Sequence, residues 1–204
     1  MKITKMERKG KSEVYKIFVD DNFFCLLTAE TIVKNKLKTG QDVDESYLYE
    51  IKKQSNKLLS RELALKYVEK GLKTEKQVRD NLLKKGMDED AILDAIDFLK
   101  TYNYVNDTHF AQQYILSKKS NGKNYLRQAL FAKGIDKDII DDVLQSYETN
   151  EERLFELALR FIKNKPKDEK LKQKTYRHIL SKGYSYEEAK KTVEKVFGES
   201  DDWN

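Results

Sequence analysis

The chain has 204 residues, yet it contains only one cysteine, one proline and two histidines. The lone Cys25 cannot form an internal disulfide, and its place within Phe23–Leu27 predicts a buried thiol. The single proline, Pro166, leaves room for long uninterrupted helices. No apolar run is long enough to span a bilayer, and the charged segment Met1–Lys11 is unlike a signal peptide. We therefore expect a cytoplasmic protein.

The sequence also lacks the motifs of most enzymes. It has no glycine-rich phosphate loop, no nucleophile elbow and no HExxH. His109 and His178 lie far apart and do not combine with Cys25 into a metal-ligand cluster, so structural histidines are favoured. The acidic run Asp88–Asp90 fits charges at a helix start better than paired catalytic carboxylates. We expect no catalytic residue, no metal and no cofactor, and a protein that acts by binding.

The chain contains an internal repeat. Three glycines each follow a lysine, precede an apolar or aromatic residue and stand four positions after Leu or Ile; they are Gly86, Gly134 and Gly183. Glycine ends a helix in the left-handed conformation, and the lysine favours the negative end of the helix dipole. Three alanines keep step with these glycines at a spacing of 47 residues; they are Ala64, Ala111 and Ala158.

The glycine motif and the alanine motif recur at nearly the same spacing. This agreement indicates a unit of three short helices that is present three times. This period predicts a mainly α protein, an elongated array of tandem three-helix repeats that bury their faces on their neighbours. Residues 3–27 alternate like strands and predict a small N-terminal β-hairpin or meander, followed by helices. The expected divisions are this N-terminal part in residues 1–58, repeat one in 59–105, repeat two in 106–148 and repeat three in 149–204, the last with a short acidic tail from Gly198.

Local start signals predict where the helices begin. Ser60 and Thr74 are expected to cap the first and second helices of repeat one, and Asp88 the third. Thr149 is expected to open repeat three as an N-cap. Pro166 is expected to open the second helix of that repeat, where its missing N–H costs least.

An aromatic side chain holds the same register in every repeat. These residues are Tyr67, Tyr114 and Phe161. They could form a platform on which nucleic-acid bases stack, but core packing between the repeat units is the favoured interpretation.

The basic residues are the best functional candidates. The net charge is only +5, but residues 118–133 contain no acid, and residues 160–182 contain nine Lys or Arg against two acids. A solvated helix face is the plain explanation. Spacings of three or four residues favour cationic stripes that meet an extended polyanionic partner. The candidates are Lys118, Lys119, Lys123, Arg127, Lys133, Lys163, Lys167, Lys170, Lys174 and Arg177.

The order of motifs resembles the RecX family of bacterial regulators of the RecA recombinase. The central block carries the resemblance through Tyr104–Asp107, Phe110–Ala111, Tyr114, Gly122–Lys123, Leu130 and Lys133–Ile135. The first repeat and the N-terminal extension add Ala64, Tyr67, Thr74–Glu75, Lys85–Gly86 and Leu37–Gly40.

The resemblance implies a curved helical-repeat protein that lies in the groove of the RecA filament on single-stranded DNA. It implies a non-enzymatic regulator that inhibits or tunes strand exchange and ATP hydrolysis in recombination, DNA repair and the SOS response. The basic candidates would then contact the filament or, directly, its DNA. No membrane and no small-molecule substrate are implied.

Two other interpretations stay open on the residues alone. One is a helix-turn-helix-like DNA-binding protein, although the third helix of repeat one, DEDAILDAID from Asp88, is acidic and would repel DNA. The other is a helical-repeat scaffold for a protein partner without DNA. Salt dependence of binding separates them, because phosphate contacts weaken steeply with salt.

Overall fold

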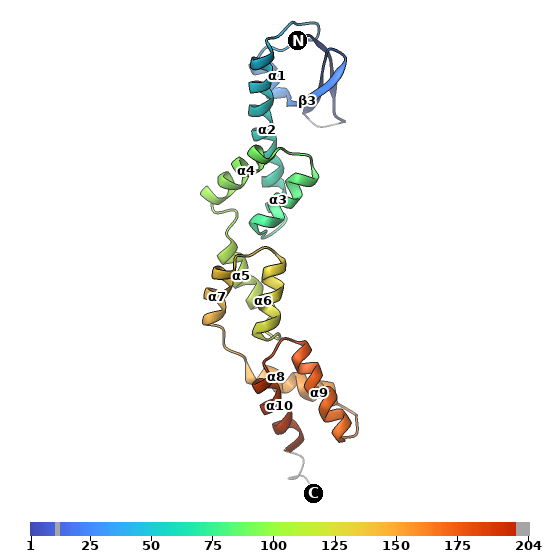
Figure 1. Ribbon diagram of the computed structural model, residues 1–204, viewed down its shortest axis with the longest axis vertical. Helices are drawn as coiled ribbons and strands as arrows, with labels where there is room; N and C mark the ends of the chain where they lie inside the picture. The colour runs from blue at the N-terminus through green and yellow to red at the C-terminus, as the bar shows by residue number, and fades with distance from the viewer. Residues whose placement is uncertain (11–12, 199–204) are drawn as a thin grey trace. The chain divides into compact units, whose positions relative to one another are not determined.

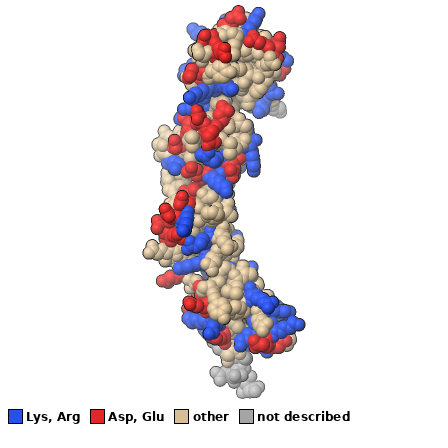
Figure 2. All heavy atoms as spheres, in the orientation of Figure 1, with Lys and Arg blue, Asp and Glu red and all other residues tan. Residues whose placement is uncertain are grey.

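The computed structural model describes residues 1–10 and 13–198 (Figure 1). Within these residues the protein has ten helices and one three-stranded sheet, which confirms the predicted mainly helical class with tandem repeats. The chain forms two compact units, residues 1–105 and a second that begins at Asn106. Basic and acidic side chains are interspersed over the face shown in Figure 2. The predicted acidic tail beyond Gly198 lies outside the described residues.

The N-terminal sheet is an antiparallel meander, as expected. Its strands, in the order β1-β2-β3, are β1 (Ile3–Arg8), β2 (Val14–Val19) and β3 (Asn22–Thr28). Alternate residues of each strand point to one face, so Ile17, Cys25 and Leu27 are all buried there. Helix α1 (Ala29–Lys34), capped by the side chain of Thr28, follows the last strand directly.

Helix α2 (Glu45–Val68) is continuous and serves both the sheet and repeat one. The Asp44 side chain caps it by accepting from the Tyr47 amide at 3.0 Å. Leu48 belongs to the core under the sheet, whereas Leu59 belongs to the core of repeat one. The prediction that Ser60 caps a new helix is wrong. No glycine or proline interrupts residues 45–68, and an apolar face runs through them, so the helix continues.

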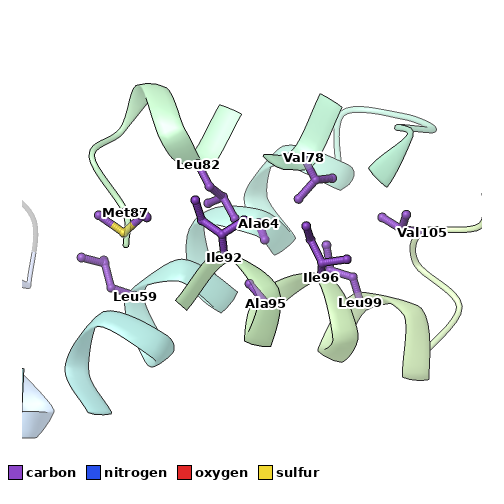
Figure 3. Close-up of a cluster of buried hydrophobic side chains, with 10 residues drawn as sticks. All are labelled: Leu59, Ala64, Val78, Leu82, Met87, Ile92, Ala95, Ile96, Leu99 and Val105. Carbon is purple, nitrogen blue, oxygen red and sulfur yellow. The ribbon is translucent and has the colours of Figure 1, made fainter. Parts of the chain in front are cut away.

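Repeat one is completed by α3 (Glu75–Lys84) and α4 (Glu89–Thr101). Thr74 caps α3 in a capping box with Gln77, and Asp88 stands at the N-cap of α4, both as predicted. Figure 3 shows how side chains from the three helices meet in one apolar core. Its members are Leu59, Ala64, Val78, Leu82, Met87, Ile92, Ala95, Ile96, Leu99 and Val105.

Repeat two has the same construction. Its helices are α5 (Asp107–Ser117), α6 (Lys123–Ala132) and α7 (Lys137–Gln145). Ala111 at the repeated alanine position is completely buried, as is Leu130 four residues before the glycine. The core consists of Ala111, Ile115, Leu126, Leu130, Ile135, Ile140 and Leu144.

Repeat three comprises α8 (Glu151–Ile162), α9 (Glu169–Ser181) and α10 (Tyr186–Gly198). Two predicted helix starts are wrong here. Asn150, not Thr149, caps α8, and its side chain accepts from the Arg153 amide at 2.8 Å. Asp168 caps α9 through the Leu171 amide, so Pro166 lies in the connection before that helix. In each case a stronger capping residue stands one or two positions further along the chain.

The repeated glycines end the second helix of each repeat, as predicted. Their φ angles are +75°, +83° and +83° at Gly86, Gly134 and Gly183. In repeat one the amide of the next residue, Met87, donates to the Leu82 carbonyl at 3.2 Å, which closes the turn and buries the Met87 side chain.

Candidate functional site

All ten predicted basic residues lie in the second unit, at the α5–α6 and α8–α9 connections and along α6 and α9. Nine are exposed and one, Lys133, is half-buried. Figure 2 shows part of this basic surface over repeats two and three. The structure therefore brings the candidates onto two helices and the connections that precede them.

Helix α6 carries its cations at exposed positions that flank its buried face. Leu126 and Leu130 are completely buried, whereas Lys123 and Arg127, one turn apart, are exposed. One turn further along the same face lies Phe131, whose side chain is 69% exposed. The face that this helix offers to a partner is thus cationic at its start and aromatic at its end.

Helix α9 has the same arrangement with a longer basic face. Leu171, Thr175 and Ile179 recur every four residues on the buried side. Lys170, Lys174 and Arg177 occupy the exposed side at positions i, i+4 and i+7. These three side chains form one stripe on the helix surface.

Three of the ten candidates have partners within the protein. Arg127 forms an ion pair with Asp141 of α7. The Lys133 ammonium lies 5.2 Å from the centre of the Tyr114 ring, and Lys167 donates to the Val196 carbonyl at 3.1 Å. These side chains stabilise their own repeats by local contacts.

The other seven make no ion pair with any residue in the described part of the chain. They are Lys118, Lys119, Lys123, Lys163, Lys170, Lys174 and Arg177. Exposed and unpaired cations keep their full attraction for an external anionic surface.

Repeat one pairs four of its nine Lys and Arg residues with its own carboxylates, among the described residues. Asp94, with 16% of its side chain exposed, accepts from Arg61 Nε at 2.6 Å and lies 3.3 Å from Lys57 Nζ. Burial raises the pKa of the Asp94 carboxyl, but the hydrogen bonds and charges of Arg61 and Lys57 outweigh burial and lower it. Arg79 pairs with Glu89 of the next helix. Repeat one also has exposed lysines that make no ion pair with a described residue; they are Lys70, Lys76, Lys84 and Lys85.

The repeated aromatic residues serve packing, but inside their own repeats; the predicted packing between repeats stays a prediction. Tyr67, Tyr114 and Phe161 are half-buried against the cores of their repeats. Each also lies under a lysine ammonium, at 5.3 Å for Lys73 on Tyr67 and 4.0 Å for Lys165 on Phe161. The sequence does not predict these contacts, because Lys133 follows a different helix from Tyr114, and Lys73 lies beyond the end of the helix that carries Tyr67.

The remaining candidates for chemistry have structural roles. Among the described residues, no group of three His, Cys, Asp or Glu is placed to hold a metal ion. His178 stacks on Phe161 with the ring centres 4.3 Å apart, and burial, with the charges of Lys182 and Lys165, lowers its pKa. Cys25 is buried, and burial raises the pKa of its thiol to about 12. None of the helices described is long and apolar enough to cross a membrane.

The comparisons with known proteins match the three repeats individually. Models of the RecX first, second and third three-helix domains match residues 61–99, 106–144 and 149–199. The chain belongs to the RecX family. It is 39% identical over 203 residues to the regulatory protein RecX of Clostridium botulinum (strain Alaska E43 / Type E3). The alignment covers 96% of this chain and 96% of that protein.

Other RecX proteins agree. The regulatory protein RecX of Clostridium perfringens (strain 13 / Type A) is 38% identical over 194 residues, with 91% of this chain and 92% of that protein covered. The crystal structure of RecX from Lactobacillus salivarius is similar with a TM-score of 0.64 at 26% identity, over 69% of this chain and 96% of that chain. A second crystal structure of regulatory protein RecX has a TM-score of 0.67 over 97% of this chain and 98% of that one; at 22% identity it supports the fold alone.

Proposed function

We propose that this RecX chain is a non-enzymatic, cytoplasmic regulator that binds the RecA filament on single-stranded DNA and inhibits strand exchange and ATP hydrolysis. Membership in a family whose members are named regulatory proteins supports a regulatory role. The observation that carries the proposal is the set of seven unpaired, exposed cations on repeats two and three. A nucleoprotein filament presents a repeating negative surface that such cations attract.

Charge reversal near the start of α6 tests the contact. Lys118, Lys119 and Lys123 are exposed and make no ion pair with a described residue. Because the charge of Lys123 also lowers the pKa of Glu188, the triple change to Glu is compared with the double change at Lys118 and Lys119, which leaves that interaction intact. We expect the affinity for RecA filaments, assembled on single-stranded DNA with a nucleotide that keeps them intact, to fall at least about tenfold, or about 1.4 kcal/mol. Arg127 is left unchanged, because its loss would leave Asp141 without its partner.

The matched control reverses exposed cations elsewhere. Lys34 and Lys38 lie beside the N-terminal sheet and are also exposed. The double change to Glu should leave filament affinity within about twofold of the parent, since an ion-pair effect confined to one surface does not extend past the Debye length of about 10 Å. Equal affinity of the triple variant and the parent would show that the start of α6 does not contact the filament.

Affinities for three partners distinguish recognition of RecA, of DNA and of the assembled filament. The parent is titrated against RecA without DNA, against single-stranded DNA without RecA, and against the assembled filament. We expect the filament to bind most tightly and its affinity to fall steeply with salt, as contacts to phosphates require. Equal affinity for free RecA and the filament, with little effect of salt, would favour a protein scaffold that does not touch DNA.

A further inference from the structure

Helix α6 begins without a capping side chain. Its N-cap residue is Gly122, and no side chain accepts from the first amides of the helix. Backbone carbonyls of repeat three accept instead. The Gly122 amide donates to the Lys182 carbonyl at 3.0 Å, and the Asn124 amide donates to the Gly183 carbonyl at 3.0 Å. The carbonyl end of α9 thus caps the amide end of α6, and the opposite partial charges of the two helix ends attract.

The two backbones meet so closely that neither has room for a side chain. A Cβ atom at Gly122 would lie 2.2 Å from the Gly183 carbonyl oxygen. A Cβ atom at Gly183 would lie 2.3 Å from the backbone nitrogen of Tyr125. Gly86 ends the equivalent helix of repeat one, and a Cβ atom there would meet nothing within 4 Å. The close approach at the junction of repeats two and three therefore has no counterpart at Gly86.

Side-chain hydrogen bonds within each repeat hold the segments beside this junction. The Tyr147 hydroxyl donates to the Asn121 carbonyl at 2.9 Å. The Glu188 carboxylate accepts from the Thr149 hydroxyl and from the Ser185 amide. Burial raises the pKa of Glu188, but these hydrogen bonds and the charge of Lys123 outweigh burial and lower it, so the carboxylate stays charged at neutral pH.

We propose that Gly122 and Gly183 are positioning residues that join repeats two and three into one binding body. The cations at the start of α6 and those along α9 then engage one acidic partner together. Two sets of contacts held at a fixed separation bind with a high effective concentration, which a loose connection would lower. This inference rests on the proposed function for its partner, but the joint itself can be tested without RecA.

Gly122→Ser should break the contact between Gly122 and Gly183 while disturbing helix α6 little. Gly122 has φ −74°, which any residue adopts, and serine is a better N-cap than glycine. In a helix without this junction the change would be stabilising, so any loss comes from the contact with Gly183. Gly122→Ala is a second variant with the smallest possible side chain.

Spin labels on α6 and α9 report the joint directly. Cysteines are placed at the exposed positions Ala132 and Gln173, while the buried Cys25 stays unlabelled. Double electron–electron resonance should give one narrow distance distribution in the parent and a broad one in Gly122→Ser. A label pair inside repeat three, at Gln173 and Lys190, should stay narrow in both. An unchanged α6–α9 distribution in both Gly122 variants would overturn the proposed joint.

Filament binding then tests whether the joint positions the cations. We expect Gly122→Ser to bind RecA filaments at least about tenfold more weakly, with a shallower dependence on salt, because only one cationic set engages at a time. Gly183→Ala should do the same. Its matched control is Gly86→Ala, which suffers the same left-handed strain in open space and should bind like the parent.

The outcomes separate the two proposals. If Gly122→Ser broadens the distance distribution but binds as tightly as the parent, the positioning role is wrong and the proposed function stands. If the parent does not bind the filament, the proposed function fails and the positioning role with it, while the spin-label result still decides whether the joint exists.

Discussion

Lys123 and Arg127 lie one turn apart on the same face of α6, yet they differ in what they offer a partner. Arg127 is paired with Asp141 of α7, and Lys123 has no ion pair among the described residues. The spacing along α6 predicts that both are exposed. It cannot predict the pair, because Asp141 comes from a different helix whose position depends on the packing of the whole repeat.

Asp94 provides a test of the paired charges in repeat one. Replacing it by Asn keeps the shape but removes the charge that Arg61 and Lys57 contact. We expect Asp94→Asn to lower the free energy of unfolding at pH 7 by about 1–2 kcal/mol, since a hydrogen bond to a charged group is lost and two cations remain beside a neutral amide. Urea denaturation followed by circular dichroism measures the difference.

The pH dependence gives the sign of this contribution. The folded-state pKa of Asp94 is below its ordinary value of 3.8, so the ionised carboxylate stabilises the fold. The contribution is full above the ordinary pKa and is lost as the pH falls through the lower, folded-state value. The gap between parent and variant should therefore close in acid. A gap that stays constant down to pH 2 would contradict the assigned ion pair.

Cys25 should be chemically inert while the sheet is intact. Only a thiolate attacks a disulfide reagent, and the pKa of about 12 leaves almost none at pH 8. We expect modification of Cys25 by an aromatic disulfide to be slow and to accelerate in step with unfolding by urea. Rapid modification of the native protein would show that the core beneath the sheet opens independently.

At the scale of helices and strands, the sequence predicts those starts that depend on neighbouring residues alone. Thr74 with Gln77 is an example, because the cap and the amide that it serves lie within three residues. Asp88 also stands at the predicted N-cap, although its side chain accepts from Asn56 and not from an amide of α4. Ser60 carries the same local signal but lies inside α2, where the apolar surface buried against two cores outweighs a capping bond. Local chemistry cannot reveal that outcome.

Serine and threonine at these positions should therefore respond oppositely to alanine. The Ser60 hydroxyl is buried and has no hydrogen-bond partner, so Ser60→Ala should leave stability unchanged or raise it by up to about 1 kcal/mol. Thr74→Ala removes a capping box and should cost about 1 kcal/mol. Thermal melts of both variants compare the two directly. Equal losses would mean that Ser60 caps a helix after all.

The candidate basic surface was likewise predictable only where it depends on residues that are close in the sequence. The spacing predicts one stripe of Lys163, Lys167, Lys170 and Lys174. Only Lys170 and Lys174 lie on the exposed face of α9, where Arg177 joins them, because the first two precede the helix. The contact between Gly122 and Gly183 has no such signal, because the two glycines are 61 positions apart and their approach depends on how the repeats pack.

At the scale of the whole molecule, exposed cations without an ion pair to a described residue occur in both units. Lys84 and Lys85 of repeat one are examples, beside the seven candidates of repeats two and three. The second unit differs in the stripe of Lys170, Lys174 and Arg177 on one face of α9, and we expect this unit to contact a negative partner. That the repeats form an elongated array stays a prediction.

Strand exchange catalysed by RecA, with ATP hydrolysis on single-stranded DNA recorded in parallel, tests the central claim most directly. The purified chain is added at stoichiometric excess over RecA, and the triple Glu variant at Lys118, Lys119 and Lys123 is compared at the same concentrations. We predict that the parent lowers both rates and that the triple variant needs at least about tenfold more protein for the same effect. Unchanged strand exchange and unchanged ATP hydrolysis with the parent at excess would contradict the proposed regulation of RecA.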